Sequence, residues 1–356
     1  MTEPCLLLTG ASGLVGSAWL PWLLENYPDR RIVILSRSPQ RSIRPKNNLV
    51  TIVRGDLTQR NLGLAVDDQK ALSQSITEII HCAADIRFRL PLGEARATNL
   101  AGTRRLLALA RRSKYLEKFA HISTVYVAGR QRGMVPEARF RNTSGFLNSY
   151  QQSKYEAEQL VFEAMPEIPA SIFRLSSIIS DSNGNVRQSN YFHQVLRLVP
   201  RNPFPVIPGE SGAPLDLIAS DWAASALAVL YDSHFTPGRV YHVCAGAEAS
   251  MSVGEILDRT FRILNERRRA QAVPPRLVGL DEFERFARQQ AKSASSSVKK
   301  LLGVIQEFLP QLAIPQCYEN RATMALLERA GLQLPPVREY YARVVESCFG
   351  GRSHEV

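Results

Sequence analysis

The feature that most constrains this sequence is a glycine-rich turn near its start. The apolar run Cys5–Leu8 leads into Thr9, and glycines then stand at every third position, as Gly10, Gly13 and Gly16. An apolar helical pattern follows, through Trp19, Leu20, Leu23 and Leu24. A buried strand that enters such a turn at a helix N-terminus directs backbone N–H groups and the positive end of the helix dipole toward an anion. We therefore expect a strand, a phosphate-binding loop and a helix, in this order.

The three glycines of the turn are expected to do different things. Gly10 allows the sharp turn, Gly13 lets the backbone approach a pyrophosphate, and Gly16 lets the helix pack closely on the strand. Contacts with the phosphates are expected along the whole turn, from Thr9, Gly10, Ser12, Gly13, Leu14, Val15 and Gly16. Pro21 falls inside the helix, so we expect it to kink the helix or to remove one hydrogen bond.

Strand and helix patterns alternate through the first half of the chain. Apolar strand patterns recur at residues 31–37, 49–53, 78–84, 119–127 and 170–175. Helical patterns lie between them, at 67–75, from 98 onward and at 150–161. Five such alternations predict a Rossmann-type α/β fold, which is a doubly wound parallel sheet with right-handed crossovers.

The character of the chain changes after residue 176. Residues 180–215 are rich in Asn, Pro and Gly, a helix pattern starts at 221, and a strand pattern covers 240–244. From 251 the chain is helical and amphipathic, apart from a Ser/Ala-rich stretch at 291–298 that we expect to be a mobile loop. We assign residues 1–180 and about 213–245 to a dinucleotide-binding domain. Residues of about 181–212 and 246–356 form a smaller, mainly helical substrate-binding region.

The residue after the second strand indicates which dinucleotide is bound. An acidic side chain there would accept a hydrogen bond from the ribose 2′-OH and favour NAD. Here Arg37 follows Ser36, with Arg41 and Lys46 nearby. A guanidinium suits a 2′-phosphate, so NADP(H) is the expected cofactor.

The next two strand ends also carry residues suited to a cofactor. Asp56, followed by Leu57, is placed to accept a hydrogen bond from the adenine amino group. Ala83 and Ala84 are small, so a cofactor can lie flat over the backbone at the end of the fourth strand. His81 sits inside that apolar strand, and we expect it to be a hydrogen-bonded core residue.

Acid–base chemistry is predicted at the fifth strand and the helix that follows its loop. Tyr150 and Lys154 are four residues apart and so share one helical face. Reduction of a carbonyl needs a proton, and we expect the Lys154 ammonium to lower the pKa of Tyr150 and to bind the nicotinamide ribose. Thr124 would hold the carbonyl oxygen, with Ser123 as the neighbouring candidate. Because strand residues alternate between faces, only one of these two should point into the cleft. The loop of about twenty residues after this strand is expected to be functional.

Several of these segments resemble extended short-chain dehydrogenases/reductases. The similarity is greatest to their acyl-thioester reductase branch, which includes fatty acyl reductases of the male-sterility type and the terminal reductase domains of carrier-protein assembly lines. The similar segments lie within about residues 5–245 and are 81–88, 91–92, 99–103, 121–127, 150–154 and 172–174.

The resemblance implies NADP(H) as cofactor and Thr124, Tyr150 and Lys154 as a catalytic triad. Hydride delivery to a thioester carbonyl would then give an aldehyde, and a second reduction to an alcohol is left open. Asn99, Leu175 and Ser177 complete the predicted cofactor contacts. Leu175 stands where the family often has proline, which leaves the nicotinamide contacts there open.

Composition narrows the class of partner and the location. The net charge is +11, with basic residues clustered at 104–118 and 267–269. A basic surface suits an acyl thioester on CoA or on an acyl carrier protein, because each presents phosphate or acidic groups. Nucleic-acid-binding motifs are not seen, and no run reaches the roughly 18 apolar residues of a membrane span. With no signal-peptide pattern and five scattered cysteines, we expect a cytoplasmic protein with reduced, structural thiols, no metal site and an oligomeric state left open.

Three other functions stay open at this point. An NADP-dependent oxidoreductase of ketones or alcohols, of the hydroxysteroid or flavonol-reductase type, would share the fold and cofactor. A nucleotide-sugar epimerase or dehydratase is weakly suggested by residues 209–212 and 216–221, but such enzymes usually retain NAD, which Arg37 disfavours. A non-catalytic dinucleotide sensor would have no need of Thr124, Tyr150 and Lys154 together.

Overall fold

The centre of the molecule is a seven-stranded parallel sheet. The computed structural model describes residues 4–38, 49–201, 205–268, 271–293, 302–303, 306 and 308–350. The strands lie in the order β12-β7-β5-β4-β1-β2-β3, and every neighbouring pair is parallel. They are β1 (Cys5–Thr9), β2 (Arg31–Ser36), β3 (Val50–Arg54), β4 (Ile76–His81), β5 (Lys118–Thr124), β7 (Ala170–Leu175) and β12 (Val240–Val243). This order confirms the predicted Rossmann-type fold.

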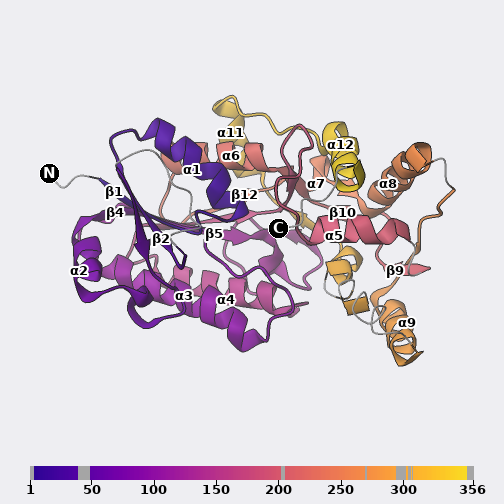
Figure 1. The fold of residues 1–356 in the computed structure, drawn as a ribbon, viewed down its shortest axis with the longest axis horizontal. Helices are drawn as coiled ribbons and strands as arrows, with labels where there is room; N and C mark the ends of the chain where they lie inside the picture. The colour runs from indigo at the N-terminus through magenta and orange to yellow at the C-terminus, as the bar shows by residue number, and fades with distance from the viewer. Residues whose placement is uncertain are drawn as a thin grey trace.

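Helices cover both faces of this sheet, which is why its strands are continuous apolar runs. Helices α1 (Leu14–Asn26) and α6 (Ser220–Asp232) pack together on one face. The pair α3 (Leu92–Arg112) and α4 (Ser149–Ala164) packs on the other, near α2 (Val66–Ser75), as Figure 1 shows. All central residues of β1, from Leu6 to Leu8, are at most 1% exposed.

A second group of helices lies at the other end of the molecule from α2 (Figure 1). It contains α5 (Tyr191–Leu198), α8 (Val253–Arg268), α9 (Leu280–Ser293) and α12 (Val337–Gly350). This group also contains two short two-stranded sheets. In one, β9 (Val206–Pro208) pairs with β14 (Arg276–Val278), and in the other, β10 (Pro214–Leu215) pairs with β13 (Met251–Ser252). A further pair, β11 (Leu217–Ala219) with β8 (Ser177–Ser180), leads into α6.

The region after residue 251 is therefore not wholly helical. Besides α8, α9, α11 (Arg321–Arg329) and α12, it contributes β13, β14 and β15 (Gln316–Tyr318). The short helix α7 (Gly246–Ala249) precedes it. Strands of two or three residues are too short to show an alternating pattern in a sequence. The predicted mobile loop at 291–298 begins inside α9, and its remainder lies outside the described residues, as do Arg41 and Lys46.

Several element boundaries differ from those expected, and the strand expected at 78–84 is β4, which ends at His81. Helix α3 begins at Leu92 rather than at Thr98, with Pro91 as its N-cap residue, so Asn99 lies two turns inside the helix. Strand β5 ends at Thr124, and Val125–Ala128 form the 3₁₀ turn η3. Helix α1 is continuous through the exposed Pro21, which costs only the hydrogen bond that its missing N–H cannot donate.

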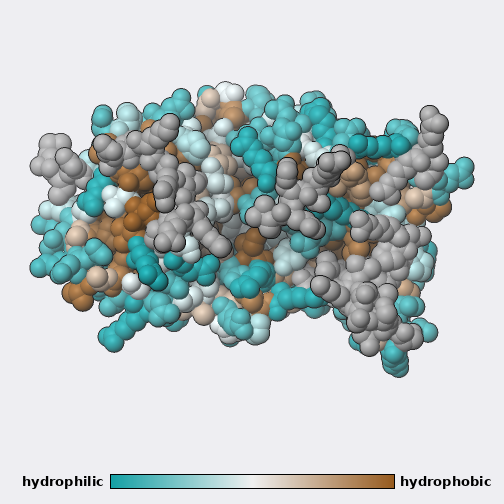
Figure 2. All heavy atoms as spheres, in the orientation of Figure 1, coloured by the Kyte–Doolittle hydropathy of each residue, from teal (hydrophilic) through white to brown (hydrophobic). Residues whose placement is uncertain are grey.

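One hydrophobic cluster runs through both groups of elements. It includes Leu8 of β1, Leu227 of α6 and Val345 of α12. In the part of the chain that the structure describes, no helix is both long and apolar enough to cross a bilayer. The face in Figure 2 is mainly hydrophilic with scattered hydrophobic areas. The division into two domains stays a prediction.

Candidate active site

The glycine-rich turn packs too tightly for larger residues. Gly10 has φ of +75°, and a Cβ there would lie 2.6 Å from the backbone nitrogen of Ala83. A Cβ on Gly16 would lie 2.3 Å from the carbonyl oxygen of Gly10. Glycine is thus required at both positions, in one case for the turn and in the other for close packing of the helix.

The N-terminus of α1 suits a pyrophosphate. Gly13 is its N-cap residue, no side chain caps the first turn, and no acidic residue lies there. Ser12 and Gly13 are exposed, while Leu14 and Val15 are half-buried. Backbone donors and the positive end of the helix dipole therefore remain available to an anion.

Thr9 and His81 form a buried polar pair under this turn. The Thr9 hydroxyl lies 2.8 Å from His81 Nδ1 and accepts a hydrogen bond from the Ala83 N–H, while His81 Nε2 lies 3.0 Å from the Thr103 hydroxyl. Burial, with the Lys154 charge second, lowers the pKa of His81 to about 3. The prediction that His81 is a hydrogen-bonded core residue is confirmed. The Thr9 hydroxyl is thus hydrogen-bonded within the protein, to His81 and to the Ala83 N–H.

The residues predicted to hold the adenosine end lie at the carboxyl ends of β2 and β3. Arg37 is exposed directly after β2. A hydrogen bond from Arg87 lowers the pKa of Asp85, in the segment that follows β4, and the charge of Arg37 adds a smaller effect in the same direction. Asp56 is half-buried, and its Oδ1 accepts hydrogen bonds from the N–H and the hydroxyl of Thr58. Leu57 is buried beside Asp56.

Asn99 holds the segment that follows β4. Its Oδ1 accepts a hydrogen bond from the Asp85 N–H at 2.7 Å, and its Nδ2 donates to the Asp85 carbonyl and to the Ser153 hydroxyl, both at 2.9 Å. The side chain is buried. These bonds position the segment, and the direct cofactor contact expected of Asn99 stays a prediction. Ala83 and Ala84, in the same segment, are half-buried.

Thr124 and Tyr150 come together at the carboxyl end of β5. Burial raises the pKa of Tyr150, and a hydrogen bond with the Thr124 side chain partly opposes this rise. Thr124 Oγ1 also accepts a hydrogen bond from the Tyr126 N–H. Ser123 is buried, and its hydroxyl has no partner among the described residues. Since neighbouring strand residues face opposite ways, Thr124 is the one that faces Tyr150.

Lys154 is buried on the same helix and is bonded to the backbone of β5. Its Nζ donates to the Ile122 carbonyl at 2.8 Å and lies 3.4 Å from His121 Nε2. Burial lowers the pKa of Lys154 to about 8. Burial likewise raises the pKa of Tyr150 to about 12, against the smaller effect of Thr124. The expectation that Lys154 lowers the pKa of Tyr150 is therefore wrong for this arrangement, because burial of the phenol dominates and Lys154 turns to Ile122.

An aromatic stack that the sequence did not predict covers Tyr150. The ring of Phe88 stacks on Tyr150, with centroids 5.5 Å apart, and on Tyr191 of α5 at 4.6 Å. Phe308 lies nearly parallel to Phe88 at 6.5 Å. Phe88 was visible only as part of the family resemblance. Its partners lie more than 60 residues away, so no local pattern could reveal them.

The loop after β5 is tied to the C-terminal part of the chain. Strand β6 (Gly133–Val135), inside this loop, pairs in parallel with β15. A chain of buried amides continues the link, since Gln151 Nε2 donates to Gln311 and Gln311 Nε2 donates to Gln316, both at 2.8 Å. The predicted cofactor residues Leu175 and Ser177 lie where β7 ends and β8 begins. Leu175 is buried, and the Ser177 hydroxyl forms a hydrogen bond with the Tyr126 hydroxyl.

Comparisons with known proteins agree with this arrangement. A family model described as "Male sterility protein" matches residues 8–227. Fatty acyl-CoA reductase 1 of Xenopus laevis is 31% identical over 143 residues, covering 34% of this chain and 28% of that protein. Fatty acyl-CoA reductase wat of Drosophila melanogaster is 24% identical over 221 residues, covering 49% of this chain and 43% of that protein. The chain thus spans less than half the length of either relative.

Two solved structures are similar over nearly the whole chain. The terminal R domain from the myxalamid PKS-NRPS biosynthetic pathway has a TM-score of 0.78 and 26% identity, covering 98% of this chain and 90% of that one. MoeE5 in complex with UDP-glucuronic acid and NAD has a TM-score of 0.65 and 19% identity, covering 96% and 98%. The second likeness shows the fold alone. The family match covers more than half of the chain, so this chain belongs to the male sterility protein family of extended short-chain dehydrogenases/reductases and carries its NAD-binding domain.

Proposed function

We propose that the chain is an NADPH-dependent reductase that converts an acyl thioester, carried on CoA or on an acyl carrier protein, to the aldehyde. The observation that carries this proposal is the meeting of Thr124 and Tyr150 at the carboxyl end of a parallel sheet whose first turn suits a pyrophosphate. The likeness to fatty acyl-CoA reductases and to a terminal reductase domain supports the thioester substrate.

The residues of the site have separate tasks. A bound NADPH supplies the hydride. Thr124 and Tyr150 hold the carbonyl oxygen by hydrogen bonds, and Tyr150 donates the proton that this oxygen needs. The phenol stays protonated at neutral pH, since burial raises the pKa of Tyr150 to about 12. Lys154 carries a positive charge beneath the site below about pH 8. The resulting hemithioacetal then collapses: its hydroxyl gives up its proton as the C–S bond breaks, the carbonyl of the aldehyde forms, and the sulfur takes up a proton and leaves as a thiol.

Two further parts of the proposal concern the cofactor and the partner. Arg37 is exposed after β2, where it can pair with the 2′-phosphate of NADP(H). The net charge of +11 suits phosphate-bearing CoA or an acidic carrier protein. Residues 1–180 and about 213–245 would bind the cofactor, and the remaining residues would bind the substrate.

The test is an assay with several substrate classes and both nicotinamides. Purified protein is mixed with NADPH or NADH and an acyl-CoA, an acyl-carrier thioester, a ketone or a nucleotide sugar. We expect NADPH oxidation with the thioesters, in step with release of free thiol and formation of aldehyde. The same assay shows whether aldehyde is consumed further to alcohol.

A matched variant tests the proton donor. Tyr150→Phe keeps the ring that stacks on Phe88 but has no hydroxyl, so it should lower kcat about 100-fold or more, as expected for loss of a general acid. Full activity of this variant would contradict the proposed role of Tyr150. NADPH oxidation with ketones alone, without thiol release, would refute the thioester substrate.

A further inference from the structure

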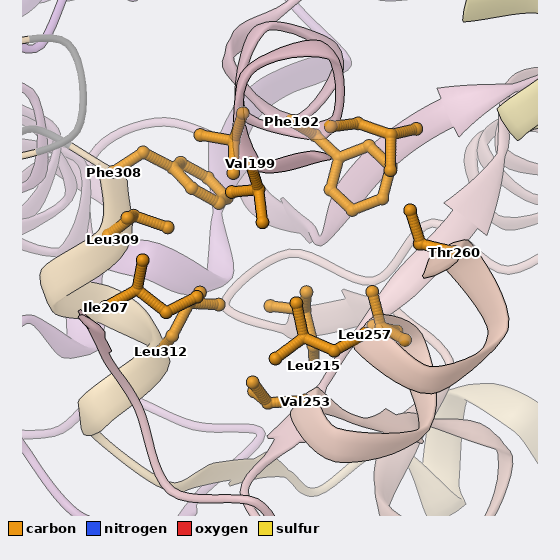
Figure 3. A pocket seen from close by; sticks show the side chains of 13 residues that line it. Phe192, Val199, Ile207, Leu215, Val253, Leu257, Thr260, Phe308, Leu309 and Leu312 are labelled. Carbon is orange, nitrogen blue, oxygen red and sulfur yellow. The ribbon is translucent and has the colours of Figure 1, made fainter. Parts of the chain in front are cut away.

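An apolar pocket lies between the helices of the second group. Its walls come from α5, α8, β9 and the 3₁₀ turn η5 (Leu309–Ala313). In Figure 3, side chains from these elements point into a common space. Every lining residue except Thr260 is apolar. A pocket of this kind favours a hydrocarbon ligand, since a polar one would lose its hydrogen bonds to water on entry.

The single polar lining residue does not change this character. The Thr260 hydroxyl lies 2.7 Å from the hydroxyl of Tyr341 on α12, and both residues are buried. The two hydroxyls satisfy each other, so Thr260 offers its methyl group rather than an open hydrogen-bonding position.

The pocket is joined to Tyr150 through the aromatic stack. Phe308 lines the pocket and also lies parallel to Phe88, whose ring stacks on Tyr150. Tyr191, which stacks on the same ring, directly precedes the lining residue Phe192. In Figure 3, Phe308 and Thr260 stand on opposite sides of the pocket. One side of the pocket thus lies toward Tyr150, and the other is formed by Leu257 and Thr260 of α8.

We propose that this pocket seats the hydrocarbon part of the acyl group, which passes Phe88 and Phe308 as it leaves Tyr150 and ends against Leu257 and Thr260. The inference rests on the proposed function. It adds the site of the acyl chain and the residues that limit the length of the chain that can bind. Each methylene that enters should raise kcat/KM about fourfold, which is the fold-change for burial of one CH₂. The increase should stop when the chain reaches Thr260.

The experiment compares kcat/KM for saturated acyl-CoAs of increasing length. Thr260→Phe fills the far end of the pocket and should lower kcat/KM for the longest chains at least tenfold, while butanoyl-CoA changes less than twofold. Leu257→Phe fills the same end and should shift the profile in the same direction if Thr260→Phe does not fold.

Two controls separate pocket volume from other effects. Thr260→Val keeps the size but removes the hydroxyl and should leave the length profile unchanged. Asp258→Phe adds the same bulk at an exposed position of the same helix and should also leave it unchanged.

A binding measurement separates failure of this inference from failure of the proposed function. Fluorescence of cis-parinaric acid, an apolar chain, is recorded without nicotinamide or thioester. Binding that Thr260→Phe abolishes supports the chain site even in a protein that reduces no thioester. If wild type, Thr260→Phe and Leu257→Phe all reduce thioesters with the same dependence of kcat/KM on chain length, the pocket does not hold the acyl chain. That result would leave the proposed function intact.

Discussion

At the scale of single residues, burial controls the chemistry of the site more than sequence spacing does. Tyr150 and Lys154 stand four residues apart on one helix, yet Lys154 donates to the Ile122 carbonyl and Tyr150 lies against Thr124 and Phe88. Spacing brings two side chains to one face of a helix, but their neighbours decide where each one points. Burial by these neighbours is also the main cause of the shifted pKa values of Tyr150 and Lys154.

The activity should depend on pH through Lys154. Burial lowers the pKa of Lys154 to about 8, so the ammonium is present below that pH and lost above it. We expect kcat/KM to fall as the pH rises through about 8. In Lys154→Arg the guanidinium stays charged, so this variant should be slower but should show no fall near pH 8. An identical basic limb in both proteins would show that Lys154 does not control the profile.

Arg37 should determine the choice between the two nicotinamides. Arg37→Asp places a carboxylate where the 2′-phosphate of NADPH would lie, so kcat/KM for NADPH should drop by about tenfold to 100-fold. The value for NADH should change little, because that cofactor has no 2′-phosphate. Measuring both cofactors with one substrate checks this, and equal losses would show that Arg37 does not contact the phosphate.

The residues that could be predicted from sequence are those determined by their own strand or turn. Gly10, Gly16 and His81 fall in this class, since a turn, a close packing contact and an apolar strand are all local features. The Phe88 stack and the Gln151–Gln311 bond join residues far apart in the chain, and nothing local indicates them. The position of Asn99 was noted, but its partner Asp85 depends on how α3 meets the segment after β4.

At the scale of elements, one buried ion pair holds helix α4 to the sheet. Arg174 of β7 bonds both carboxylate oxygens of Glu158 on α4, with side chains 1% and 0% exposed. The same guanidinium donates to the carbonyls of Pro136 and Ala138, in the loop after β6. It therefore connects helix α4, strand β7 and the loop after β5.

Removing one partner of this ion pair should be costly. Arg174→Met leaves the Glu158 carboxylate buried without its charge partner, so the free energy of unfolding should fall by about 3–5 kcal/mol. The control is Arg111→Met, which breaks the more exposed pair with Glu167 and should cost less than about 1 kcal/mol. Urea unfolding measures both, and equal losses would contradict the structural role of Arg174.

Most elements were predictable because their patterns are long. The strands of the sheet are apolar runs of four to seven residues, and their alternation with helices was enough to predict the Rossmann-type order. The start of α3 was missed because Gly93, Thr98 and Asn99 are weak helix formers, whereas Pro91 is compatible with a helix start. The pairing of β6 with β15 joins two three-residue strands that lie far apart in the chain, which no periodicity shows.

At the scale of the whole molecule, the two groups of elements share one core. The largest hydrophobic cluster extends from β1 to α12 and includes Trp19 and Trp222. All three tryptophans lie in α1 or α6, so their fluorescence reports only on the sheet region. If the core is shared, a destabilising substitution far from the tryptophans should still lower the midpoint of the unfolding transition that their fluorescence reports.

A cavity in α8 of the second group tests this. Leu264 is 2% exposed and belongs to the shared cluster. Leu264→Ala should cost about 2–5 kcal/mol and lower the midpoint of both the tryptophan fluorescence and the circular dichroism transitions. Val273→Ala, at a position 69% exposed, should change the free energy of unfolding by less than about 0.5 kcal/mol. Two separate transitions, with only one of them shifted, would contradict a single cooperative unit.

The position of β12 has a consequence for producing parts of this chain. The family match ends at residue 227, which lies within α6, whereas the strand that covers the edge of β7 is formed by Val240–Val243. A fragment cut at the end of the match would leave the N–H and C=O groups along that edge of β7 without a neighbouring strand. Such an edge pairs readily with other copies of itself, so the fragment would precipitate rather than fold. The segment that the family model matches is therefore shorter than the segment needed to complete the sheet.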